Sequence, residues 1–248
     1  MYKRQYQPNL IIQDELHLIS GPLGSIVGLY EAGFDYILQQ NGNLPKYLGS
    51  TATIRNSQDQ ISNLYNRRVH QFPPDGLEAD DNFFVKTISK DEIGSSEGRR
   101  YVGIMGTGKT QVTSEVRLFG ALLASISELG FSEAEEDLFW TVVGYFNSIR
   151  ELGKASTLLV DDVQDEIQRI ARRNGHSVRH LNNNVELTSR VSTGMITQTL
   201  DDLSVPHTGS SGAVDTLIAT NMLSVGIDVA RLNAMVVVGQ PKLSSEYI

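Results

Sequence analysis

The sequence has no cysteine, so disulfide bonds, thiolate zinc sites and cysteine nucleophiles are excluded. It also has no run of about 18 or more apolar residues, the length that a transmembrane helix needs. Its charged first residues are not followed by the apolar core of a secretory signal. We therefore expect a protein without membrane segments, and the absence of cysteine fits the reducing cytoplasm.

Basic residues are scarce relative to acidic ones. The chain has 21 Lys and Arg against 29 Asp and Glu, a formal net charge of −8. This balance disfavours a protein that coats nucleic acid by general attraction, but it allows a local groove that grips a few phosphates. The 248 residues, of which 40% are hydrophobic and 20% charged, suit a globular protein with one large domain or two small ones.

The first part of the chain has two short apolar runs, residues 8–13 and 45–48, which predict strands. The first of these runs has the composition of a buried parallel strand. Residues 20–25 predict a loop because they contain glycine and proline, and residues 26–40 and 57–65 have apolar side chains at helical spacing.

The pattern weakens over residues 67–98, where we place a connection between two domains, 1–96 and 97–248. Beyond it, the spacing predicts helices over 113–129 and 155–173 and strands over 101–105, 141–146, 216–219 and 234–238. Asn174-Gly175 is a typical end for the second helix. Alternation of strands and helices predicts an α/β fold with a largely parallel sheet.

Asp14-Glu15-Leu16-His17 lies at the end of the first predicted strand. In open α/β sheets, ligands bind at the carboxyl ends of the strands. One carboxylate there can hold Mg²⁺, usually through water, and a second can orient the water that attacks a γ-phosphate. Acids after a strand are also common in solvated turns, so the tetrapeptide alone leaves both interpretations open.

The order of further motifs resembles superfamily 2 helicases, which implies two RecA-like lobes. The residues that match their motifs II, III and V are Asp14, Glu15 and His17; Ser50, Thr51, Ala52 and Thr53; and Ala219, Thr220, Gly226 and Asp228. The resemblance implies that Asp14 holds the Mg²⁺ of bound ATP, that Glu15 orients the attacking water, and that His17 couples the nucleotide state to Ser50 and Thr51.

Two more stretches look like helicase motifs: 145–152 resembles motif IV, and 186–190 the next motif at a strand end. The resemblance implies that Gly226 and Asp228 lie near the nucleotide. It also implies a nucleic-acid track, DNA rather than RNA, held mostly at the phosphates. The residues expected to line this track are Asn147, Arg150, Ser189, Arg190 and Thr220.

Whole stretches are similar to the large helicase component of DISARM anti-phage defence systems: QDELHLISGPLGS, YFNSIRELG, ELTSR and ATNMLSVGIDVARLNAMVVVGQPK. The resemblance implies an ATP-dependent helicase or translocase with ATP and Mg²⁺ as cofactors. It also implies a role in antiviral defence with protein partners from that system.

Two helicase motifs that neutralise phosphate charge have no counterpart at their usual places. Only 13 residues precede Asp14, where motif I belongs, and the chain stops at Ile248, before motif VI. The resemblance thus implies a truncated first lobe. Because both motifs stabilise the transition state, we expect this chain alone to hydrolyse ATP weakly or not at all, whereas the intact parent is an ATP hydrolase.

Gly103, Gly108, Lys109 and Thr110 fit the Walker A pattern and precede a predicted helix. One alternative is therefore a stand-alone P-loop NTPase built on Lys109, with Asp161 or Asp162 on the metal. Against it, the loop follows motif III, where a glycine-rich helix cap fits better than a phosphate loop. A further alternative is a non-catalytic RecA-like module that binds nucleic acid or a protein.

Overall fold

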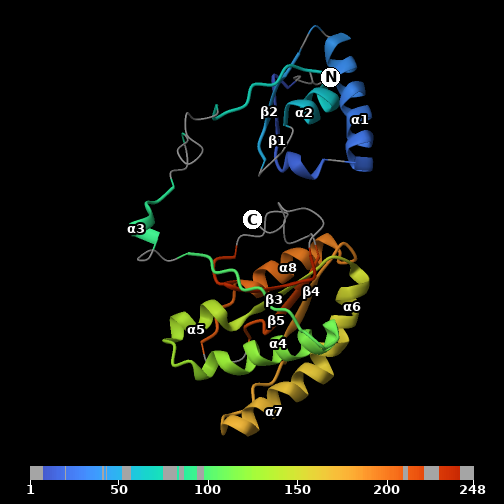
Figure 1. The fold of residues 1–248 in the computed structure, drawn as a ribbon. Coiled ribbons are helices and arrows are strands. Elements are labelled where there is room, and N and C mark those ends of the chain that lie inside the picture. The colour runs from blue at the N-terminus through green and yellow to red at the C-terminus, as the bar shows by residue number, and fades with distance from the viewer. Residues whose placement is uncertain are drawn as a thin grey trace. The chain divides into compact units, whose positions relative to one another are not determined.

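The structure is a computed structural model that describes residues 8–19, 21–40, 42, 44–51, 57–74, 83, 87–93, 98–208, 212–220 and 229–240. The chain divides into two compact units, Met1–Tyr101 and Val102–Ile248 (Figure 1). Each unit has a hydrophobic core of its own. Within the described ranges, no helix is both long and apolar enough to cross a membrane.

The first unit contains a parallel pair of strands, β1 (Leu10–Gln13) and β2 (Lys46–Gly49). Parallel neighbours need a crossover connection, which is formed by the short 3₁₀ helix η1 (Leu16–Leu18) and the long helix α1 (Gly21–Gln40). The helix α2 (Ser57–Tyr65) follows and packs against α1, and the short helix α3 (Lys90–Ile93) lies later in this unit.

The core of the first unit is small, and a group of hydrogen-bonded polar side chains lies beside it. Leu16, Leu64 and Tyr65 are its buried members. Beside them, the Tyr47 hydroxyl lies 2.9 Å from Glu31 Oε2 and 3.2 Å from Asp35 Oδ1. Arg67 pairs with Asp35 at 2.8 Å, and its guanidinium lies 4.6 Å from the centre of the Tyr47 ring. These contacts hold α1 against β2.

Two predictions for this unit need correction. Residues 21–25 are not a loop, because α1 already begins at Gly21 and Pro22 is compatible with the first helical turn. The first strand is parallel as predicted but is not buried, since Leu10 and Ile12 are 49% and 66% exposed. The reason is that Leu10 and Ile12 share one face of the strand, whereas the core lies on the other face, the side of Ile11 and its partner Tyr47.

The second unit has a parallel four-stranded sheet in the order β4-β5-β3-β6. The strands are β3 (Val142–Phe146), β4 (Asn184–Leu187), β5 (Thr216–Ala219) and β6 (Ala234–Val238). The predictions for β3, β5 and β6 are confirmed. In the register, Val142 lies opposite both Thr216 and Ala234, so the carboxyl ends of the strands meet at one edge.

Helices cover both faces of this sheet (Figure 1). Val142 and Phe146 pack on one face with α4 and the α6–α7 region, and Val143 packs on the other with α8. The helical elements of this unit are α4 (Gln111–Ser125), η2 (Ile126–Glu128), α5 (Glu133–Trp140), α6 (Ile149–Leu158), the π-helical turn η3 (Leu159–Val163), α7 (Gln164–Asn174) and α8 (Thr193–Leu203).

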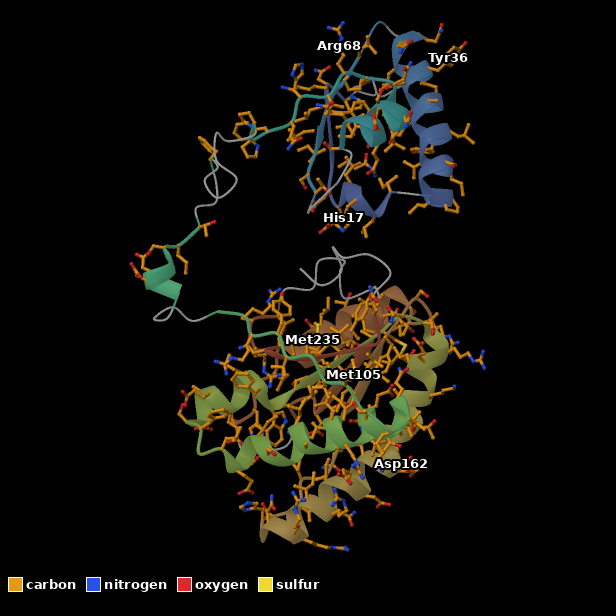
Figure 2. The ribbon with its side chains drawn as sticks, viewed as in Figure 1. His17, Tyr36, Arg68, Met105, Asp162 and Met235 are labelled. Atoms are coloured by element: carbon orange, nitrogen blue, oxygen red, sulfur yellow. The ribbon has the colours of Figure 1, made fainter. Side chains whose placement is uncertain are left out.

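The helix predicted over 155–173 is confirmed, and it begins earlier, at Ile149. It continues through the π-helical turn and ends at Gly175, whose φ of 75° supplies the left-handed C-cap. The strand predicted over 101–105 is wrong. This segment pairs with no strand of the described sheet, and its Tyr101, Ile104 and Met105 side chains are 66%, 59% and 88% exposed. Figure 2 labels Met105 in this segment.

The amino edge of the sheet is held by two buried ion pairs. Arg231 lies 2.7 Å from Asp137 and also donates to the Thr141 hydroxyl at 3.1 Å. Arg179 lies 2.9 Å from Asp215, with its guanidinium 3.6 Å from the centre of the Trp140 ring. Desolvation lowers the pKa of Arg179, so Asp215 is needed to stabilise its charge.

Candidate nucleotide site and nucleic-acid edge

The loops after β1 and β2 are joined by backbone hydrogen bonds. Gln13 is in register with Gly49, so Asp14 and Ser50 follow neighbouring strand ends. The Ser50 N–H donates to Gln13 O at 2.9 Å, and the Leu16 N–H donates to Ser50 O at 3.1 Å. The structure thus brings together the predicted motifs II and III.

The tight turn after Asp14 is fixed by its neighbours. Glu15 has a left-handed backbone, with φ 52° and ψ 42°, and Leu16 is buried in the core at 2% exposure. Gln60, on α2, donates its side-chain N–H to Leu16 O at 3.2 Å and to Ile19 O at 2.8 Å. Sequence reasoning missed Gln60, because a lone glutamine on a helix has no pattern that reveals a partner 44 positions away.

Asp14 is held as a carboxylate. It accepts a hydrogen bond from the Ser50 hydroxyl and another, of 2.9 Å, from the Glu15 N–H. These two donors, the hydroxyl first, lower the pKa of Asp14 below its ordinary value. The Asp14 carboxyl group is therefore ionised at neutral pH and suited to a cation.

Ser50→Ala is expected to raise the pKa of Asp14 towards its ordinary value, because the larger of the two stabilising donors is removed. The stabilisation from this contact is present above the unfolded-state pKa of Asp14 and is lost as pH falls through the lower folded-state pKa. Carboxyl ¹³C NMR titration measures the shift, with Ser57→Ala as a control. An unchanged Asp14 titration in Ser50→Ala would rule out this assignment.

His17 connects the two motifs through its ring. Its Nδ1 atom lies 3.2 Å from Glu15 Oε2 and 3.4 Å from Thr51 Oγ1. Figure 2 labels His17 in the first unit, on the turn after β1. Both contacts are made by the same nitrogen, so Glu15 and Thr51 share one atom of the His17 ring. Ala52 and Thr53, the other predicted motif III residues, lie outside the described residues.

The carboxyl edge of the second sheet holds the residues predicted to line the nucleic-acid track. Arg150, in the first turn of α6, and Ser189 and Arg190, after β4, are exposed. Asn147 is half-buried and donates its side-chain N–H to Val238 O at 3.2 Å. Thr220 is 5% exposed. Three of the five side chains are therefore accessible, while Asn147 joins the ends of β3 and β6.

Gly226 and Asp228, predicted to lie near the nucleotide, are outside the described residues. The same edge contains Thr188, a buried residue that sequence reasoning did not single out. Its hydroxyl donates to Glu186 Oε1 at 2.7 Å and accepts from the Arg190 N–H at 3.4 Å. Thr188 thus fixes the turn that presents Arg190.

The loop with the Walker A pattern has the geometry of a helix cap. Thr110 precedes α4, and its hydroxyl accepts from the Thr113 N–H at 3.2 Å. Gly108 has a φ of 73°, and the Lys109 N–H donates to Gly106 O at 3.0 Å. The described residues 98–106 directly before the loop form no strand, although a phosphate loop follows one. This geometry favours the predicted glycine-rich cap.

The fold is that of helicases. The DUF1998 helicase MrfA bound to DNA and AMPPNP superposes with a TM-score of 0.57 at 17% identity, over 94% of this chain and 27% of that one. The helicase Lhr of Mycobacterium smegmatis, bound to ssDNA and AMP-PNP, gives 0.50 at 16% identity, over 92% and 24%. The predicted α/β class with RecA-like lobes and mainly parallel sheets is confirmed.

The sequence is similar to a protein of one defence system. The DISARM protein DrmA of Bacillus paralicheniformis is 42% identical over 260 aligned residues, which are 98% of this chain and 22% of the relative. The resemblance to a DISARM component that the motifs predict is confirmed. The chain spans about a fifth of that relative's length, and no family model matches it.

Proposed function

We propose that this chain contributes to an ATP-dependent superfamily 2 helicase or translocase that moves along DNA in anti-phage defence. The observation that carries the proposal is the cluster of Asp14, Glu15, His17, Ser50 and Thr51 at adjacent parallel strand ends. The similarity to a DISARM protein supports the defence role, and the solved helicases with the same fold hold DNA and an ATP analogue.

Asp14 is the residue proposed to hold Mg²⁺. Among the described residues, no three His, Asp or Glu side chains gather to hold a metal ion. Mg²⁺ retains several waters and needs only one or two carboxylates when phosphates supply other ligands. One exposed carboxylate that stays ionised fits this mode. When bound, the metal would neutralise part of the negative charge of the phosphates.

Glu15 is proposed to orient the attacking water. His17 is proposed to couple the nucleotide state to Ser50 and Thr51. The left-handed turn holds Glu15 beside the Asp14 carboxylate, while the imidazole of His17 lies within reach of Glu15 and Thr51.

Arg150, Ser189 and Arg190 are proposed to hold phosphates of the track. Arginine side chains and hydroxyls at strand and helix ends are common phosphate ligands, and such contacts give grip without sequence readout. The net charge of −8 makes these local cations more important, because the rest of the surface does not attract DNA.

Arg150→Ala and Arg190→Ala are each expected to weaken binding of single-stranded DNA and to reduce the salt dependence by about one released ion. Fluorescence anisotropy of a labelled oligonucleotide across salt concentrations measures both effects. Arg172→Ala, on the exposed end of α7, is the control. Unchanged binding in both variants would contradict the proposal that these arginines hold the nucleic acid. Tighter binding of an RNA of the same sequence would show that the preferred nucleic acid is RNA.

A further inference from the structure

The helix α5 (Glu133–Trp140) buries none of its eight residues. It is held by contacts at its ends: Ser132 and Glu135 form a capping box, and the Asn233 N–H donates to Leu138 O at 3.1 Å. The ion pair of Asp137 with Arg231 fixes its inner side. The helix therefore lies on the surface of the second unit with its outer side exposed.

Large apolar side chains gather around this helix. The rings of Phe131 and Phe139 stack with their centres 5.7 Å apart, although the residues are 38% and 36% exposed. Leu129 is 60% exposed and Leu138 is 36% exposed. Four large apolar side chains within residues 129–139 thus remain in contact with water, which is typical of a protein interaction site.

Carboxylates surround these apolar side chains. Residues 128–139 contain five acidic residues and no Lys or Arg. Glu135 and Glu136 precede Phe139 by four and three positions, so they lie on the same side of the helix as its ring. We call Leu129, Phe131, Leu138 and Phe139, with Glu133, Glu135 and Glu136, the α5 patch.

Charge decides the kind of partner. Arg231 near this helix is already paired with Asp137, and the His176 ring lies 2.7 Å from Glu128. Glu133 and Glu135 are exposed, and Glu136 is half-buried and accepts a hydrogen bond from the Ser127 hydroxyl at 2.8 Å. Carboxylates repel the phosphates of nucleic acid. An apolar centre with a charged rim is the usual composition of a protein interface. A partner must then supply apolar side chains and Lys or Arg around them.

We propose that the α5 patch docks a basic amphipathic helix of a partner protein. The apolar face of that helix covers Phe131, Phe139 and Leu129, and the Lys or Arg residues at the border of this face lie near Glu133 and Glu136. The site is separate from the edge predicted to bind nucleic acid, because α5 ends where β3 begins, at the amino edge of the sheet.

The probe is a fluorescently labelled helical peptide of Leu, Ala and Lys, compared with the same peptide carrying Glu for Lys. The Lys peptide is expected to bind, and added salt is expected to weaken its binding. Leu129→Ser and Phe139→Ser should each weaken binding by about tenfold, the loss typical of a central apolar contact. Glu133→Lys combined with Glu136→Lys should weaken it at least as much.

The matched control is Asp161→Lys combined with Asp165→Lys, which changes the net charge equally at exposed positions of η3 and α7. This variant should bind the Lys peptide as the native chain does. An equal loss in the control would show that the peptide binds through general charge attraction to the acidic chain, and this result would overturn the proposal. No binding of the Lys peptide would also overturn it, as would self-association of the chain that Leu129→Ser abolishes. Leu129 is mostly exposed, so its variant remains informative if Phe139→Ser fails to fold.

Discussion

Glu15→Gln is expected to lower Mg²⁺-dependent ATP hydrolysis by roughly 100-fold or more in a polypeptide of DrmA length that contains this sequence. The amide keeps the size of the side chain but loses the charge that we propose orients the attacking water. Glu15 lies beside Asp14 in a turn fixed by the buried Leu16, so the substitution leaves the local structure intact. ATP turnover with and without single-stranded DNA measures the effect.

Lys109→Ala is the matched control for this prediction. The loop at Lys109 caps α4 with the Thr110 hydroxyl, so turnover should be unchanged in this variant. Loss of turnover in Lys109→Ala, with activity retained in Glu15→Gln, would favour the stand-alone P-loop NTPase. DNA binding that ignores ATP and survives Glu15→Gln would favour the non-catalytic module.

Asp215→Ala is expected to destabilise the second unit by about 3–5 kcal/mol, the usual cost of leaving a buried charge without its partner. The side chains of Arg179 and Asp215 are only 8% and 6% exposed. Asp215 also accepts from the Asn182 and Asn183 N–H groups at 2.9 and 3.0 Å, ahead of β4. The substitution thus removes the acceptor that joins β4 to β5.

Urea denaturation followed by tryptophan fluorescence measures this loss. The chain has a single tryptophan, Trp140, and Arg179 stacks on it. Glu166→Gln is the control: its partner Arg169 is 56% exposed, so water can solvate that charge when the pair is removed, and we expect a smaller loss than in Asp215→Ala. A loss in Asp215→Ala no larger than in the control would show that Arg179 is stabilised without Asp215.

Prediction from sequence succeeded where a local pattern is enough to determine the element. The helix Ser57–Tyr65 and the strands Thr216–Ala219 and Ala234–Val238 lie at their predicted bounds, because each has apolar side chains at the spacing of its element and buries some of them in a core. The apolar run 101–105 failed, since a strand also needs a hydrogen-bonded neighbour and the described sheet offers it none.

Hydrophobic patterns and local motifs were enough to predict the α/β class, the strands β1, β2, β3, β5 and β6, and the placement of Asp14 and Ser50 directly after strands. These features follow from hydrophobic periodicity and from local motifs. Only the tertiary structure decided that the Ser50 hydroxyl bonds to Asp14, that Gln60 supports the turn, that Thr220 is buried, and that α5 lies exposed. These features depend on contacts between residues far apart in the chain, which no local pattern records.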